Sequence, residues 1–164
     1  MRVSTLNRKI HRWGAILTAL PVLIIVLSGM LLQLKKETNW IQPPTCKSSG
    51  GPLVIGFDRI LEIASGIPEA DVSSWDDIDR LDMRPGRGIV KVRPRSRWEI
   101  QIDMATGEVL QVAYRRSDII ESIHDGTFFH SAVKLWVFLP VAVVILALWC
   151  TGIYLFLLPH LRRR

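Results

Sequence analysis

The sequence GAILTALPVLIIVLSGMLLQL at residues 14–34 contains no charged side chain. A second uncharged stretch, LWVFLPVAVVILALWCTGIYLFLL, covers residues 135–158. As α-helices the two stretches would be about 31 and 36 Å long, at 1.5 Å per residue, and the hydrocarbon core of a bilayer is about 30 Å thick. Both stretches therefore predict transmembrane helices, and the rest of the chain has to be arranged around them.

The first stretch has a cleaved signal peptide as its alternative. A signal peptide has an apolar region of about 7–15 residues that ends at a small-residue cleavage site. Here the apolar run is longer and passes directly into Leu34, Lys35 and Lys36. We therefore expect an uncleaved membrane anchor.

The charges of the chain are unevenly distributed. All 15 acidic residues lie between Glu37 and Asp125, whereas the N-terminal tail carries four basic residues and the C-terminus ends in three arginines. Residues 35–130 hold 13 basic and 15 acidic residues, so the centre is nearly neutral. Basic tails around a balanced centre predict a membrane hairpin with both termini in the cytoplasm. Because the net charge of +6 comes from the tails, it does not indicate a nucleic-acid partner.

The predicted organisation follows from these two helices and from the composition between them. Pro, Ser and Gly dominate the segment after the first helix, which is typical of a linker. The expected parts are a cytoplasmic tail (1–13), a first transmembrane helix (14–34), a linker (35–52), a periplasmic domain (53–123), an interfacial collar (124–132), a second transmembrane helix (133–158) and a cytoplasmic tail (159–164).

The periplasmic domain begins with a helical pattern and continues with strand patterns. Four apolar residues recur at helical spacing: Phe57, Ile60, Leu61 and Ala64. Later segments alternate apolar and polar side chains, or read as a further strand: 78–83, 89–93, 98–103 and 108–114. These patterns predict one short helix on a three- or four-stranded antiparallel sheet. The fold class is therefore a membrane α+β fold.

Each predicted transmembrane helix contains one proline and one Ser/Thr-Gly pair. In an antiparallel arrangement Pro140 would lie at the depth of Gly29, and Pro21 at the depth of Gly152. Small residues let two helix backbones approach closely in a membrane. We expect the two helices to pack on each other at these four positions.

The collar contains two of the four histidines of the chain. Its sequence is IHDGTFFH at residues 123–130, with His124 and His130 near its ends. Phe128 and Phe129 are suited to the membrane interface, and Gly126 permits a turn.

At several of these segments the chain resembles the PepSY-associated transmembrane family. The matching segments are RKIHRW (8–13), LSG (27–29), DMATGEVL (103–110), IHDGTFF (123–129) and TG (151–152). The resemblance implies a PepSY domain outside the membrane, between the helices. Larger members of the family have more helices and include iron-regulated inner-membrane proteins and haem-b ferric-siderophore reductases. PepSY domains also occur in peptidase propeptides, where they act as inhibitors or chaperones.

The resemblance makes His11 and His124 candidate ligands of haem b. A haem with two axial imidazoles needs them on opposite faces of one macrocycle, and these two histidines would lie roughly 30 Å apart. Each would therefore need a second ligand on its own side, with His160 as the candidate near His11 and His130 as the candidate near His124. The alternative is that all four are interfacial histidines without a cofactor. No metal ion is predicted.

A basic run with period two forms another candidate site. Its members are Lys91, Arg93, Arg95 and Arg97. They would line one face of the sheet and bind an anionic ligand or an acidic partner. The alternative is a solvated face, or an edge strand protected by cations. The sequence has no nucleophile–base motif, phosphate-binding loop or thiolate cluster, so no catalytic residue is predicted.

These features favour a non-catalytic accessory subunit of a larger membrane complex that is linked to redox or iron chemistry. Its partners would be the lipid bilayer and either other membrane subunits or a second copy of the chain. One alternative is a haem-b electron carrier or ferric-siderophore reductase component that is complete only as an oligomer. Another alternative is a peptidase regulator.

Overall fold

Residues 3–161 are described by the computed structural model, with side chains for residues 5–158. The chain divides into two compact units. The first, here called the hairpin unit, consists of the chain up to residue 32 and from residue 119 onward. The second, here called the sheet domain, consists of Gln33–Asp118.

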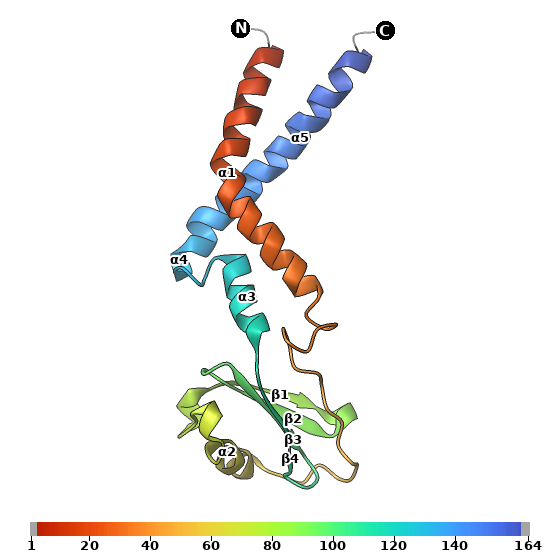
Figure 1. The fold of residues 1–164 in the computed structure, drawn as a ribbon, viewed down its shortest axis with the longest axis vertical. Helices are drawn as coiled ribbons and strands as arrows, with labels where there is room; N and C mark the ends of the chain where they lie inside the picture. The colour runs from red at the N-terminus through yellow and green to blue at the C-terminus, as the bar shows by residue number, and fades with distance from the viewer. Residues whose placement is uncertain (1–2, 162–164) are drawn as a thin grey trace. The chain divides into compact units, whose positions relative to one another are not determined.

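The hairpin unit is built from two long helical rods. The first rod is α1 (Val3–Gln33). The second consists of α4 (Ser131–Val133), a π-helical stretch (Lys134–Phe138) and α5 (Leu139–Leu161) (Figure 1). Both rods are long and apolar enough to cross a membrane, over Thr5–Gln33 and Ser131–Leu158. Only 11% and 6% of their most apolar windows are buried, so they do not resemble the buried core helices of a soluble protein.

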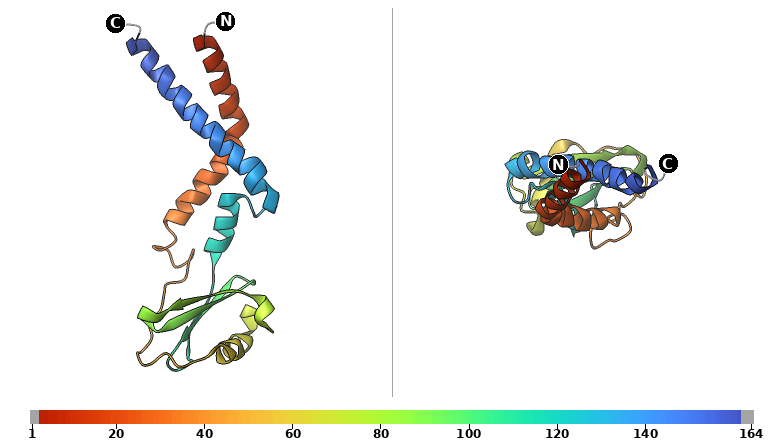
Figure 2. Two further views of the ribbon diagram at one scale, coloured as in Figure 1. Left: turned by 180° about the vertical axis from the view of Figure 1, so that it is seen from behind. Right: turned by 90° about the horizontal axis from the view of Figure 1, so that it is seen from above.

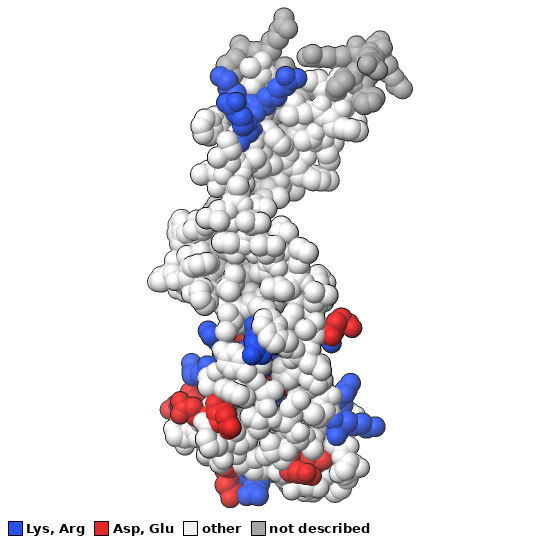
Figure 3. Space-filling view, in the orientation of Figure 1, with Lys and Arg blue, Asp and Glu red and all other residues white. Residues whose placement is uncertain are grey.

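The surface of the hairpin unit is apolar, as lipid requires. Leu17 and Trp136 are 78% and 79% exposed. Lysine and arginine side chains gather near the start of α1, and an uncharged region follows (Figure 3). The helices α1 and α5 cross once and diverge towards the ends that carry the two termini (Figures 1 and 2). Gly14 permits the contact, because a methyl group there would lie 3.1 Å from Leu148 Cδ2.

The sheet domain contains the predicted sheet and helix, and the predicted fold class is confirmed. Four antiparallel strands follow one another in the order β1–β2–β3–β4. Their bounds are Ile78–Arg84, Ile89–Pro94, Trp98–Asp103 and Val109–Tyr114. The helix α2 (Phe57–Ser65) covers one face of this sheet (Figure 1).

The two faces of the sheet are buried in different ways. Ile60 and Ala64 of α2 pack on Val92, Ile100 and other apolar strand residues to form the core. Because side chains alternate along a strand, the opposite face carries polar side chains. Four of them are nevertheless at most 2% exposed: Lys91, Glu99, Gln101 and Asp103.

Residues 42–49, here called the strap, cover this polar face. The Cys46 N–H donates to Gln101 Oε1 (2.8 Å), and Gln101 Nε2 donates to the Pro44 carbonyl (2.7 Å). The Ser48 N–H donates to the Arg87 carbonyl at 2.9 Å. The strap lies within the segment that the sequence predicted as a linker between domains. Its sequence shows neither a strand nor a helix pattern. Its backbone groups are instead held in place by hydrogen bonds to buried side chains of the sheet.

A short helix that the sequence did not predict follows the sheet. This helix, α3, runs from Arg116 to Asp125, within the chain that was expected to be domain and collar. Gly126 then turns the chain with a φ of +83°, a conformation in which glycine has no steric cost. At the end of the turn, His130 caps α4 by accepting a hydrogen bond at Nδ1 from the Ala132 N–H (3.1 Å).

We expect Gly88→Ala to detach the strap and to lower the free energy of unfolding by about 1–3 kcal/mol. Gly88 has a φ of +68°, and a methyl group on it would lie 2.7 Å from Ser48 Cβ. Gly86→Ala is the matched control, because a methyl group there meets nothing within 4 Å. Thermal unfolding of the full chain in detergent micelles, followed by circular dichroism, measures both variants. Equal stabilities of the two variants would contradict the position of the strap.

Candidate functional site

One candidate site in the hairpin unit is the contact between His11 on α1 and Thr151 on α5. His11 Nδ1 lies 3.2 Å from Thr151 Oγ1. The Thr151 hydroxyl donates its hydrogen to the Leu148 carbonyl (3.0 Å), so its oxygen accepts from His11. The neutral ring therefore carries its proton on Nδ1 and an electron pair on Nε2. Gly152 leaves room for the ring, because a methyl group there would lie 3.7 Å from His11 Cε1.

An equivalent contact joins His124 on α3 to α1. His124 Nδ1 lies 3.1 Å from both Ser28 Oγ and the Ile25 carbonyl. A carbonyl can only accept, so Nδ1 of this ring is also a donor and Nε2 holds the electron pair. The Ser28 hydroxyl donates to the Ile24 carbonyl (2.5 Å). A methyl group on Gly29 would lie 3.3 Å from His124 Cε1. Each Ser/Thr-Gly pair thus receives one histidine from another helix.

The two candidate haem ligands His11 and His124 do not lie close enough to share one haem within a chain. His11 and Ser28 are 17 positions apart, which is about 26 Å along α1, so the His11 and His124 contacts are well separated. His130 uses Nδ1 as an acceptor, so its neutral ring has the proton on Nε2 and no free electron pair there. The side chain of His160 lies outside the described residues. Among the side chains of residues 5–158, no group of three or more His, Cys, Asp or Glu residues is placed to hold a metal ion.

The predicted helix-packing residues have different surroundings. Gly29 and Gly152 lie against histidine rings, whereas Pro140 is exposed and Pro21 is half-buried. The contact between α1 and α5 depends on Gly14, which the sequence analysis did not select. Two apolar grooves of about 360 Å³ each adjoin this contact, and both are lined by Ile10 and Thr151. Their further lining includes Cys150 and Tyr154 in one groove, and Leu17 and Ala147 in the other.

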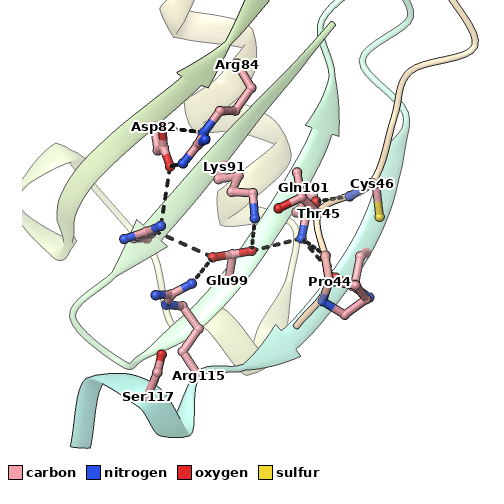
Figure 4. Close-up of polar contacts among 12 residues, drawn as sticks. Pro44, Thr45, Cys46, Asp82, Arg84, Lys91, Glu99, Gln101, Arg115 and Ser117 are labelled. Carbon is pink, nitrogen blue, oxygen red and sulfur yellow. Dashed lines mark hydrogen bonds and ion pairs between the residues drawn. The ribbon is translucent and has the colours of Figure 1, made fainter. Parts of the chain in front are cut away.

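A second candidate site lies on the polar face of the sheet domain, around Glu99. Lys91 Nζ lies 3.0 Å from Glu99 Oε1, and Arg115 Nη1 lies 2.5 Å from Oε2. Arg93 Nε is 3.6 Å from the same Oε2, and Gln101 Nε2 donates to Oε1 at 2.8 Å. Figure 4 shows Glu99 between these groups, with Gln101 linking it to the strap. The buried carboxylate of Glu99 therefore lies within ion-pair distance of three cations.

A second carboxylate, Asp82, faces the same cations from β1. Arg84 binds it through Nε (2.9 Å) and Nη2 (2.8 Å), and Arg93 Nη2 lies 3.4 Å away. The hydrogen bonds from Arg84 hold the pKa of Asp82 below its usual range. Burial, and then the positive charge of Arg115, lower the pKa of the Arg93 guanidinium. Glu99 and Asp82 act in the opposite direction and favour the charged form of Arg93.

The strap and the sheet enclose a cleft of about 410 Å³ beside these carboxylates, here called the basic cleft. Its lining consists of Lys35, Lys36, Gln42, Pro43, Pro44, Thr45, Arg84, Arg87, Lys91 and Arg93. Six of these side chains are cationic and none is acidic.

The structure places two of the four residues of the predicted basic run at the basic cleft. Lys91 and Arg93 line the basic cleft, but Arg95 and Arg97 are exposed and outside its lining. Arg95 Nε donates to the Asp76 carbonyl (2.8 Å), and Arg97 occupies a turn with a φ of +67°. The solvated-face alternative does not describe Lys91, which is 2% exposed.

Several residues of the site carried no signal that the sequence analysis used. Glu99 sits in an alternating strand, and the antiparallel pairing of Lys91 with Gln101 could have placed it beside Arg93. Lys35 and Lys36 join the cleft through a tertiary contact with strands about fifty positions away, and no local pattern reveals such a contact.

Comparison with known proteins identifies the family of the chain. No curated protein and no solved structure matches it. The family described as PepSY-associated TM region matches residues 8–164, which include all but the first three residues of the first candidate span, the whole second span and the whole sheet domain. The chain is therefore a membrane protein that belongs to the PepSY-associated TM region family.

Proposed function

We propose that the protein is a non-catalytic accessory subunit of a larger bacterial inner-membrane complex. The observation that carries this proposal is the short contact between α1 and α5. The two candidate spans are 29 and 28 residues long, yet they cross once and leave apolar grooves beside the crossing. The resemblance to family members with redox and iron functions supports a complex of that kind.

The grooves are suited to a helix of another subunit. In a membrane, lipid tails are as apolar as leucine, so helices associate through close packing and polar contacts. Ala147 supplies a small surface at one groove, and the Tyr154 side chain lines the other. A third helix could pack on both α1 and α5 there, whereas lipid chains would fill the same space less specifically.

We further propose that both termini lie in the cytoplasm and the sheet domain in the periplasm. The excess of basic residues in the two tails supports this orientation, since cytoplasmic ends of transmembrane helices are enriched in lysine and arginine.

A second candidate function is haem-b electron transfer, and the histidine contacts favour it. His11 and His124 both donate from Nδ1 and keep the electron pair of Nε2, the arrangement that an iron-binding imidazole needs. Because the two contacts are far apart along α1, His11 and His124 would belong to different haems, and each haem would need a second ligand on its own side.

We expect Ala147→Trp to release the protein from its complex, because the indole would fill the groove that receives the partner helix. Ala142→Trp is the matched control, since position 142 is exposed and lies about 140° around the same helix. Native electrophoresis of gently solubilised membranes should show the unmodified chain and Ala142→Trp in a larger species, and Ala147→Trp in a smaller one. A solitary monomer for all three proteins would contradict an accessory role.

Reduced-minus-oxidised spectra of the same preparations, supplied with haem, test the second candidate function, haem-b electron transfer. A haem signal that His124→Ala removes supports electron transfer, and the absence of a signal excludes it.

We expect the two ends of the hairpin to label from opposite sides of the membrane. Ser65→Cys reports on the sheet domain and Thr5→Cys on the N-terminal end, and both positions are exposed. The free native cysteines, Cys46 and Cys150, are first changed to serine. In intact spheroplasts an impermeant maleimide should modify Ser65→Cys alone, and permeabilised cells should allow both reactions. Modification of Thr5→Cys in intact spheroplasts would overturn the orientation.

A further inference from the structure

The basic cleft lies within the sheet domain, and cationic side chains predominate in its wall. Its cations come from three separate segments of the chain, at residues 35–36, 84–87 and 91–93. Asp82 and Glu99 are the carboxylates that form ion pairs with these cations, and Glu99 also pairs with Arg115. Positive charge therefore exceeds negative charge in the wall of the cleft.

One nitrogen in this wall lacks an acceptor. Arg93 Nε is buried and has no hydrogen-bond partner among the described residues, with Glu99 Oε2 at 3.6 Å. A buried donor that has no acceptor costs about 1–3 kcal/mol relative to a paired one. An oxyanion in the cleft would bring oxygen atoms close to the Arg93 guanidinium and could remove this cost.

The cleft is already formed by contacts that do not involve a ligand. Arg87 Nη1 donates to the Thr45 carbonyl (3.1 Å), which holds the strap against the turn before β2. Pro43 and Pro44 restrict the strap backbone, since proline fixes φ. Lys91 is held by Glu99 and is 2% exposed. Charged groups held in place by a rigid wall lose little conformational freedom on binding an anion.

Phosphate suits this arrangement of donors. Guanidinium groups present several N–H donors in a plane and pair with two oxygens of a phosphate, while lysine contributes a compact positive charge. The volume of about 410 Å³ exceeds what one phosphate needs, so it also accommodates part of the molecule that carries the phosphate.

The chain itself places two of the cations close to a source of phosphate. Lys35 and Lys36 follow Gln33, the last residue of the first candidate span, by two and three positions. Three residues reach at most about 10 Å, so these side chains stay near lipid head groups. Lysine and arginine next to a span are attracted to anionic lipids.

We propose that the basic cleft binds a phosphate group, carried either by an anionic phospholipid or by a soluble phosphate-bearing anion. Arg93 and Lys91 contact the phosphate from the floor of the cleft. Arg84, Arg87, Lys35 and Lys36 surround it from the rim. The proposal is independent of whether the protein belongs to a larger complex.

Isothermal titration of inorganic phosphate into the full chain, in micelles of a neutral maltoside, tests the shared chemistry. The unmodified chain should bind saturably, and Arg93→Gln should weaken binding about tenfold or more. Because Arg93 also contacts Glu99 and Asp82, Lys36→Gln provides a variant that leaves the buried cluster intact. Lys36→Gln should weaken binding several-fold, whereas Lys47→Gln should leave it unchanged. Lys47 is also exposed and carries the same charge, but it lies outside the lining of the cleft.

Native mass spectrometry of the full chain, released from nanodiscs that contain phosphatidylcholine and phosphatidylglycerol, identifies the source. Retention of one phosphatidylglycerol by the unmodified chain and by Lys47→Gln, but not by Lys36→Gln, assigns the cleft to lipid. Saturable phosphate binding with no retained phosphatidylglycerol assigns it to a soluble anion. The proposal is overturned if neither form binds, or if Lys36→Gln and Lys47→Gln bind either form equally well.

Discussion

The buried carboxylate of Glu99 is the constraint on which the sheet domain depends. It is inaccessible to solvent and lies within hydrogen-bond or ion-pair distance of Lys91, Arg93, Arg115 and Gln101. Cations buried without a counter-charge are strongly destabilising. Glu99 supplies the fully buried negative charge of this polar face, and the partly exposed Asp82 and Asp118 also pair with Arg93 and Arg115. Gln101 connects this network to the strap through its hydrogen bond to the Pro44 carbonyl. Arg115 directly precedes the first residue of α3, so the network also reaches the start of that helix.

Histidine contacts serve a comparable purpose in the hairpin unit. Each Ser/Thr-Gly pair combines an acceptor oxygen with a position that lacks a side chain, and an imidazole ring fills that position. In hydrocarbon such a polar contact cannot exchange with water, so it fixes which helix faces meet even where little surface is shared. The same contacts leave Nε2 of His11 and His124 available, which is why assembly and haem binding are both worth testing.

The parts that the sequence predicted are those with a local pattern. The uncharged runs, the α2 spacing and the period-two strands each carry their own signal, and the structure has all of them. The strap has no such signal, because its order comes from hydrogen bonds to Gln101 and Asp103 elsewhere in the chain. The alternation in β2 likewise indicated that Lys91 and Arg93 share one face of the sheet. The same pattern does not extend to Arg95 and Arg97, because the strand ends at Pro94 and the following turn directs the chain away from the cleft.

The role of Glu99 is most directly tested by the free energy of unfolding of the full chain in micelles, measured with urea for Glu99→Gln and Glu62→Gln. Both changes remove one negative charge at nearly constant size, but the pair of Glu62 with Arg59 is exposed. We expect Glu99→Gln to lose about 3–5 kcal/mol, because the buried Lys91 loses its counter-charge. Arg93 and Arg115 keep Asp82 and Asp118, which are both 26% exposed. We expect Glu62→Gln to lose less than about 1 kcal/mol. A loss for Glu99→Gln as small as that for Glu62→Gln would contradict a polar face organised around this carboxylate.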